Sequence, residues 1–103
     1  MRQGWLKIKN EILGKKYDLS VAFVDDQTME ELNRRYRKKS YPADVLSFPL
    51  SKNEGEILIN KKNRNDKNYA DLLFVHSLLH LKGYKHGAKM EFEERNIIKQ
   101  KKS

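Results

Sequence analysis

The residues of this chain whose types and spacing could do chemistry are its three histidines, which lie between positions 76 and 86. His76 and His80 are four positions apart, so on a helix both imidazoles project from the same face. Gly83 is typical of a left-handed helix end, and the turn there can bring His86 back over that face. Three neutral nitrogen ligands leave one tetrahedral position for water, which is the arrangement of a catalytic zinc site.

An unmetallated core cluster is the alternative explanation of these histidines. Burying three imidazoles costs roughly a few kcal/mol unless their nitrogens find partners. A metal ion supplies a partner to all three at once, so we predict one zinc-type ion on His76, His80 and His86. The chain has no cysteine, which excludes thiolate ligands and disulfides.

The same histidine spacing occurs in zinc proteases, whose helix carries His-Glu-x-x-His with the glutamate as general base. Here Ser77 stands at the position of that glutamate. A serine hydroxyl is a poor base, so this substitution disfavours peptide hydrolysis while leaving it open as an alternative.

Composition and charge favour a small intracellular protein with a polyanionic partner. The 103 residues are enough for a single domain over positions 1–103. Lys and Arg number 22 against 14 Asp and Glu, a net charge of +8 that favours binding to phosphates. The chain shows neither an apolar signal core at its N-terminus nor an apolar run that could cross a bilayer, so we expect a soluble, cytoplasmic protein without membrane contact.

The segments before position 25 predict a helix and then a strand. The helix would end at Gly14, and its apolar face would comprise Trp5, Leu6, Ile8, Ile12 and Leu13. From Tyr17 onward the pattern alternates, which predicts a strand whose buried face is formed by Leu19, Val21 and Phe23.

A second helix follows this strand. Thr28 and Glu31 form a capping box, which predicts that the helix begins at Thr28. Met29, Leu32 and Tyr36 make its apolar stripe, so Tyr36 is expected in the core rather than as a platform for base stacking. The other faces carry the basic run Arg34, Arg35, Arg37, Lys38 and Lys39.

The remaining pattern predicts a hairpin and two more helices. Residues 45–48 and 56–59 read as strands joined by a short turn, with Pro49 ending the first of them. A polar loop over residues 60–67 precedes a helix that starts near Asn68 and is apolar almost all round, which predicts burial on most sides. Residues 90–98 predict a last helix, and the lysine-rich tail from Lys99 is expected to fray.

Four stretches carry a resemblance to a known family. Leu-Asn-Arg-Arg-Tyr-Arg at 32–37 and Pro-Ala-Asp-Val-Leu-Ser-Phe-Pro at 42–49 resemble the family patterns Leu-Asn-x-x-Tyr-Arg and Pro-Thr-Asp-Val-Leu-Ser-Phe-Pro. The histidine segment 76–86 is similar to His-Gly-x-Leu-His-Leu-x-Gly-Tyr-Asp-His, and Gly-Glu-Ile-Leu-Ile at 55–59 resembles the weaker Gly-Asp-Ile-x-Ile. The family is YbeY, the ribosomal-RNA maturation endoribonucleases.

The resemblance implies a single-strand-specific, metal-dependent endoribonuclease that acts in processing of the small-subunit ribosomal RNA and in ribosome quality control. Its partners would be single-stranded RNA, ribosomal RNA and the small ribosomal subunit. It also implies an α+β fold, with a small mixed sheet of about three to four strands flanked by helices and a buried helix that bears the histidines. By position, His76, His80 and His86 match the zinc ligands and Arg37 the catalytic arginine, and Arg34, Arg35, Lys38 and Lys39 are expected to contact substrate.

The chain departs from the family pattern beside the ligands. Ser77 replaces the family glycine, and Lys85 stands where the family has an aspartate. A carboxylate that touches a metal-bound imidazole orients it and raises its basicity, so a cation at this place should do the opposite. We therefore expect Ser77 and Lys85 to tune the ligands, with Asp44 and Glu56 as further carboxylates that could contact them.

The chain is also short for this family, and it is expected to keep the sheet while lacking a helix of longer members. Two other functions stay open. One is a metallohydrolase of another substrate, such as a peptide. The other is a non-catalytic ribosome-binding protein whose metal only stabilises the fold.

Overall fold

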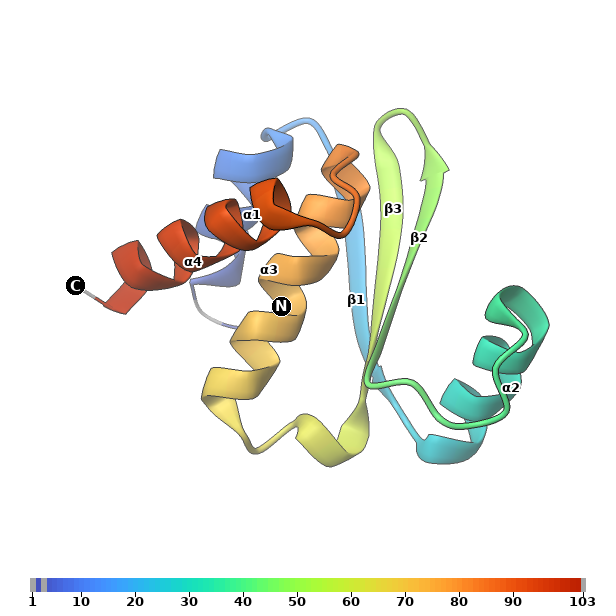
Figure 1. Ribbon diagram of the computed structural model, residues 1–103. Helices are drawn as coiled ribbons and strands as arrows, with labels where there is room; N and C mark the ends of the chain where they lie inside the picture. Colours follow the sequence, from blue (N-terminus) through green and yellow to red (C-terminus); the bar gives the residue numbers. More distant parts are fainter. Residues whose placement is uncertain (1, 3, 103) are drawn as a thin grey trace.

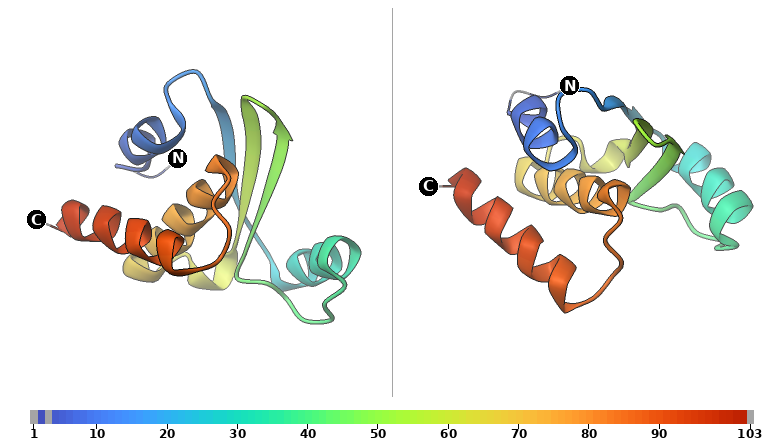
Figure 2. Two further views of the ribbon diagram at one scale, coloured as in Figure 1. Left: turned by 45° about the horizontal axis from the view of Figure 1, so that its top comes forward. Right: turned by 90° about the horizontal axis from the view of Figure 1, so that it is seen from above.

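A three-stranded sheet with helices on both sides organises the chain. The computed structural model describes residue 2 and residues 4–102. In chain order, its elements are α1 (Trp5–Leu13), β1 (Asp18–Val24), α2 (Asp26–Arg37), β2 (Val45–Ser51), β3 (Glu54–Asn60), the short 3-10 helix η1 (Lys61–Asn63), α3 (Lys67–Lys82) and α4 (Ala88–Lys102). α1, α3 and α4 lie on one side of the strands and α2 on the other (Figures 1 and 2).

The sheet is mixed, with strand order β1-β3-β2. β2 and β3 form the predicted hairpin and run antiparallel, with Leu46 opposite Leu58. β1 pairs with β3 in parallel, with Val21 opposite Ile57, so α2 and β2 lie in the connection between these two strands. These observations confirm the expected α+β class and the small mixed sheet.

Each face of the sheet carries its own hydrophobic core, because successive side chains of a strand point to opposite faces. Ile57 and Ile59 of β3 pack with α1 and α3 in the larger core. Leu58 faces the other way and packs with Met29 and Leu46 beneath α2. α3 is buried along most of its length, as its apolar sequence predicts.

One prediction about α1 and one about α2 were wrong in detail. Leu6 is 56% exposed, because Trp5, Ile8 and Ile12 define the buried stripe of α1 and position 6 is turned about 100° from position 5. α2 begins at Asp26 instead of Thr28. Its cap is Asp25, whose carboxylate accepts a hydrogen bond of 2.8 Å from the Thr28 N–H. Hydrogen bonding with the side chain and the backbone of Thr28 lowers the pKa of Asp25.

Two element boundaries and the burial of Tyr36 also differ from prediction. Pro49 lies inside β2, which is tolerated because β2 is an edge strand with an irregular register between Pro49 and Ser51. α4 is helical through Lys102 instead of fraying from Lys99. Tyr36 is 60% exposed, because the apolar stripe of α2 meets the smaller core, which lies between α2 and the sheet, through Met29 and Leu32. Tyr36 itself lies on the last turn, where its ring meets Phe48 edge-on.

Among the described residues, no helix combines the length and the apolar character that crossing a membrane requires.

Candidate metal centre

The end of α3 and the turn after it bring the three histidines together. His76 and His80 lie one turn apart on α3, and Gly83 ends the helix in a left-handed conformation at φ 114°. The Tyr84 N–H donates to the Leu79 carbonyl, which reverses the chain toward His86. The ligand nitrogens of the three side chains all lie within 4.8 Å of one another. The predicted convergence is therefore present in the fold.

Two of the imidazoles have their Nδ1 atoms engaged. His76 Nδ1 lies 2.9 Å from Oε2 of Glu94, and His80 Nδ1 lies 3.2 Å from the Tyr84 carbonyl oxygen. A carboxylate and a carbonyl can only accept, so each Nδ1 carries the hydrogen and donates. In a neutral imidazole, the opposite nitrogen then holds a lone pair and no hydrogen. His76 and His80 are thus both prepared to bind a cation through Nε2.

The two Nε2 atoms face each other at 3.2 Å. With both Nδ1 atoms protonated, neither Nε2 of the neutral rings can donate to the other, so the contact joins two acceptors. A tetrahedral zinc site with Zn–N distances of about 2.0–2.1 Å has ligand nitrogens about 3.3–3.4 Å apart. The observed separation is close to that value. The donor set therefore fits a metal ion better than a self-sufficient hydrogen-bonded cluster.

The surroundings also keep His80 neutral. Burial lowers the pKa of His80, and the nearby His76, His86 and Arg37 lower it further. A lower pKa leaves the imidazole unprotonated at neutral pH, which is the form that binds a metal. The effect of Arg37 also places its charge within electrostatic reach of the cluster.

The basic run of α2 divides into paired and unpaired cations. Arg34 and Arg35 each contact the glutamate four positions earlier, Glu30 at 3.8 Å and Glu31 at 3.4 Å. The residue four positions before Arg37 is Asn33, which has no charge. Within the described part of the chain, Arg37 makes no ion pair, and the same holds for Lys38 and Lys39. The uncompensated charge of this run therefore begins at Arg37.

Comparison with known proteins places these features in a family. The family model for endoribonuclease YbeY matches residues 2–103. The chain belongs to the YbeY family. It is 36% identical to endoribonuclease YbeY of Mycoplasma capricolum over 80% of this chain and 68% of that protein. The Thermodesulfovibrio yellowstonii protein of the same name is 42% identical over 66% of this chain and 53% of its own length.

Two more distant similarities agree with this assignment. The human endoribonuclease YbeY is 31% identical over 86% of this chain and 68% of its own length. The solution structure of a Thermotoga maritima protein superposes with a TM-score of 0.53 and 28% identity, over 95% of this chain and 82% of that one. The aligned part of this chain spans 68% of the Mycoplasma capricolum relative and 53% of the Thermodesulfovibrio yellowstonii relative.

Sequence reasoning missed Glu94, which touches His76 from α4. The expected neighbours were Ser77 and Lys85 of the YbeY motif. Ser77 is buried in α3 and Lys85 is exposed, and in the described part of the chain neither makes a hydrogen bond with an imidazole. Their tuning role stays a prediction. No local signal marks Glu94, because its position depends on how α4 packs through the buried Met90.

Asp44 of the YbeY strand motif acts elsewhere. Its carboxylate accepts hydrogen bonds from the Tyr69 hydroxyl at 2.6 Å and from Asn63 at 3.2 Å. The first of these bonds lowers the pKa of Asp44, and it raises the pKa of Tyr69 to about 12. Asp44 thus ties the start of β2 to η1 and α3. Glu56, partly buried on β3, makes no hydrogen bond with a histidine within the described residues.

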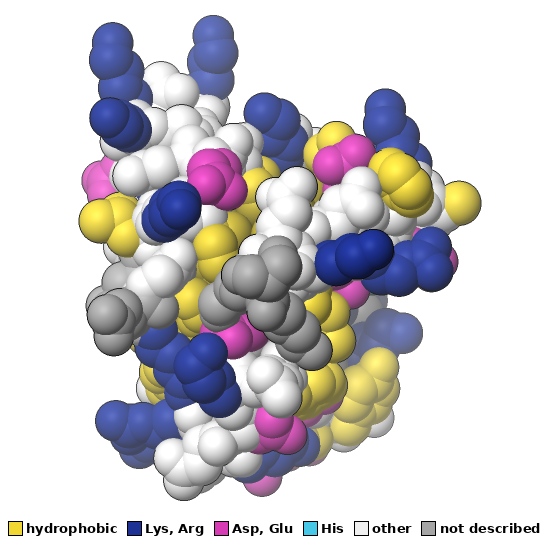
Figure 3. All heavy atoms as spheres, turned by 90° about the vertical axis from the view of Figure 1, so that its left-hand side faces the viewer, with side chains coloured by type: hydrophobic (Ala, Val, Ile, Leu, Met, Phe, Trp, Pro, Cys, Tyr) yellow, Lys and Arg dark blue, Asp and Glu magenta, His cyan; other side chains and the backbone are white. Residues whose placement is uncertain are grey.

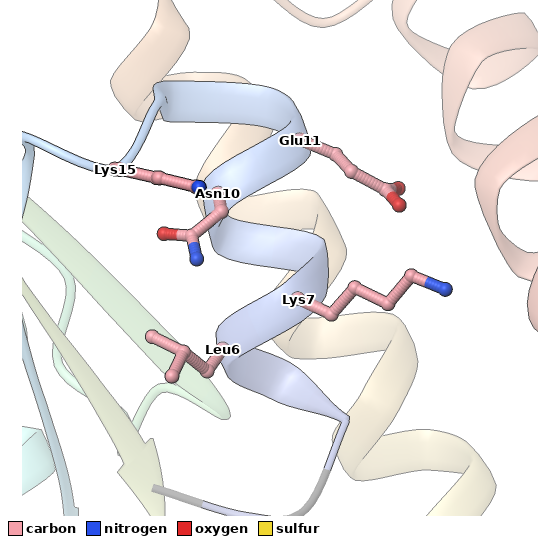
Figure 4. A pocket seen from close by; sticks show the side chains of 5 residues that line it. All are labelled: Leu6, Lys7, Asn10, Glu11 and Lys15. Atoms are coloured by element: carbon pink, nitrogen blue, oxygen red, sulfur yellow. The ribbon is translucent and has the colours of Figure 1, made fainter.

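Two surface hollows have no histidine in their lining. One of about 440 Å³ is formed by α1 and the turn after it, with Leu6, Lys7, Asn10, Glu11 and Lys15 around it (Figure 4). The face on the left of Figure 1 shows scattered basic and hydrophobic side chains, and no histidine of the described residues is visible there (Figure 3). A second hollow lies between α3 and α4 and includes Glu94. Neither hollow contains a histidine, so we assign the chemistry to the cluster itself.

Proposed function

We propose that this chain is a single-strand-specific, metal-dependent endoribonuclease that holds one zinc ion on His76, His80 and His86. Its proposed place is in ribosomal RNA processing, at the small-subunit RNA, and in ribosome quality control. The observation that carries the metal site is the pair of facing Nε2 lone pairs 3.2 Å apart. Membership of the YbeY family supports the nuclease activity, since the relatives bear that name.

The proposed division of labour follows the geometry. His76 and His80 hold the ion through Nε2 while Glu94 and the Tyr84 carbonyl keep their rings oriented. His86 completes a set of three protein ligands, the number typical of catalytic zinc sites. When bound, a zinc ion supplies Lewis-acid stabilisation of a phosphoryl oxygen and makes water more acidic.

Arg37 is the proposed phosphate-binding group. Its guanidinium has five N–H donors in a planar fork that matches two phosphoryl oxygens, and no acid occupies that fork in the described structure. A phosphate held there would lie near the histidine cluster, because the charge of Arg37 already acts on His80. Lys38 and Lys39 extend the positive surface for the neighbouring phosphates.

The deciding experiment combines metal analysis with a cleavage assay. The purified protein should carry close to one zinc-type ion and cut single-stranded RNA but not the matching duplex. Peptide hydrolysis in place of RNA cleavage would support the metallohydrolase alternative. A chelated protein that unfolds, together with a loaded protein that cuts nothing, would support the non-catalytic alternative.

Glu94→Ala is expected to weaken zinc retention by about 10- to 100-fold, because His76 loses the acceptor that orients its ring. Glu94→Gln should lie between this variant and the wild type, since an amide oxygen still accepts from Nδ1 but carries no charge. The measurement is competition with a chromophoric chelator. Glu91→Ala, an exposed carboxylate on the same helix, is the control. Equal zinc affinity of Glu94→Ala and Glu91→Ala would show that Glu94 does not support the ligand.

Affinity for single-stranded RNA should fall steeply with salt. Each phosphate neutralised on a single strand contributes a slope of about −0.7 to the plot of log affinity against log salt. Lys39→Ala should therefore make the slope shallower by about 0.7 if Lys39 meets one phosphate. Lys7→Ala, an exposed lysine on α1, should leave it unchanged. A wild-type affinity that is the same at low and moderate salt would contradict a mode led by phosphate contacts.

A further inference from the structure

Two tyrosines near the end of α2 have side chains that are largely exposed to solvent. Tyr36 is 60% exposed and Tyr41 is 56% exposed. Tyr36 belongs to the last turn of α2, and Tyr41 belongs to the loop that follows. An aromatic ring that stays in water does not gain the favourable free energy that its burial would provide. Two such rings within six residues therefore call for a functional explanation.

Both tyrosines are held in place by the elements behind them. The ring of Tyr36 meets Phe48 edge-on, with centroids 5.3 Å apart, and Phe48 packs against the smaller core between α2 and the sheet. Asn33 is buried and donates a hydrogen bond of 2.8 Å to the Tyr41 carbonyl. Lys38 takes a left-handed conformation at φ 59°, so the chain reverses there and brings Tyr41 back toward the helix. The rings are thus displayed from a rigid base, which lowers the entropy cost of binding with them.

The same stretch holds the uncompensated cations. Arg37, Lys38 and Lys39 lie between the two tyrosines in the sequence, and in the described structure none of them is paired with an acid. We name this region, made of Tyr36, Arg37, Lys38, Lys39 and Tyr41, the α2-end surface. Exposed aromatic rings among unpaired cations are the combination that binds single-stranded nucleic acid.

We propose that the α2-end surface binds unpaired nucleotides of the RNA, with bases stacked on Tyr36 and Tyr41 and the backbone held by the cations between them. This inference rests on the proposed function and deepens it, because it accounts for the preference for single strands. A base in a duplex has both faces covered by its neighbours and offers none to a tyrosine. Every unpaired base has a free π-face, so the recognition tolerates any sequence.

The test removes a ring on the protein and a base on the RNA. Tyr36→Leu keeps apolar contact with Phe48 but removes the stacking platform, and Tyr36→Phe keeps the platform. Tyr36→Leu should bind a single-stranded oligonucleotide about tenfold more weakly than the wild type, and Tyr36→Phe should bind like the wild type. Single bases of the oligonucleotide are then replaced by abasic sites, one position at a time. At the stacked position, this replacement should weaken binding by the wild type about tenfold and should hardly change binding by Tyr36→Leu. Tyr41→Leu provides the same test on an independent residue.

Metal content and thermal melting of each variant show whether the fold and the histidine site are intact. If the wild type binds and cuts single-stranded RNA, and both leucine variants bind intact and abasic strands as it does, the stacking proposal is overturned and the proposed function stands. The stacking proposal is also overturned if the leucine variants bind intact and abasic strands more weakly by the same factor, because the tyrosine rings would then contribute to binding without contacting the bases. A wild type that neither binds nor cuts single-stranded RNA would overturn the proposed function and this inference together.

Discussion

His80→Ala is expected to lose the bound zinc and, with it, RNA cleavage. The three rings form a compact triangle: the centroid of His80 lies 4.7 Å from that of His76 and 4.5 Å from that of His86, and the other two centroids are 5.0 Å apart. Removing His80 leaves two protein ligands, and a two-ligand site holds zinc poorly in competition with water. Metal assistance contributes several kcal/mol to such reactions, so cleavage should fall by roughly a thousandfold or more.

Elemental analysis and a single-turnover cleavage assay on the same preparations check this expectation. Lys82→Ala, an exposed substitution on the last turn of α3, is the matched control and should keep both metal and activity. Circular dichroism shows whether His80→Ala stays folded. The ligand assignment is wrong if His80→Ala and the control carry the same amount of metal.

Arg37→Ala is expected to keep its metal and its fold but to cut RNA roughly a hundredfold more slowly. A guanidinium has no lone pair to offer at neutral pH, so Arg37 cannot be a ligand, and its removal leaves the ion in place. The loss of a preorganised charged donor at a developing negative charge is typically worth about 3 kcal/mol. Arg37→Lys should recover only part of the rate, because a point charge lacks the fork geometry.

The structure provides matched controls on the same helix. Arg34 and Arg35 are paired with Glu30 and Glu31, so their charges are already compensated and their loss should cost less than threefold or so. Rates are measured in single-turnover experiments with saturating enzyme, and metal content is measured alongside. Equal and small losses for all three arginines would mean that Arg37 is only one part of a general basic surface.

Local patterns were enough to predict the elements and the histidine cluster. The pair His76 and His80 follows from helical periodicity, and the turn at Gly83 follows from its freedom at positive φ, which the structure confirms at 114°. Alternation predicted β1, and turn residues predicted the hairpin of β2 and β3. All of these interactions join residues close in the sequence, so the sequence by itself determined them.

Competing local signals were resolved only in the fold. Asp25 and Thr28 both suit a helix cap, and the hydrogen bond from the Thr28 N–H decides for Asp25. Tyr36 continues the apolar period of α2, but its ring meets Phe48 of β2 edge-on and the residue remains 60% exposed. Periodicity reports the face on which a side chain lies, and it does not report whether a partner element covers that face.

Contacts between distant segments needed the tertiary structure. Glu94 reaches His76 from a helix whose position depends on the burial of Met90. Arg37 belongs to α2, on the other side of the sheet, and its charge acts on His80 from there. Neither of these two long-range interactions can be predicted from the spacing of residues along the chain. The sequence alone thus determined which side chains could bind a metal, because their convergence is local. Only tertiary packing decided which carboxylate contacts them and which arginine acts on them electrostatically, because those distances are set by how whole helices pack on the sheet.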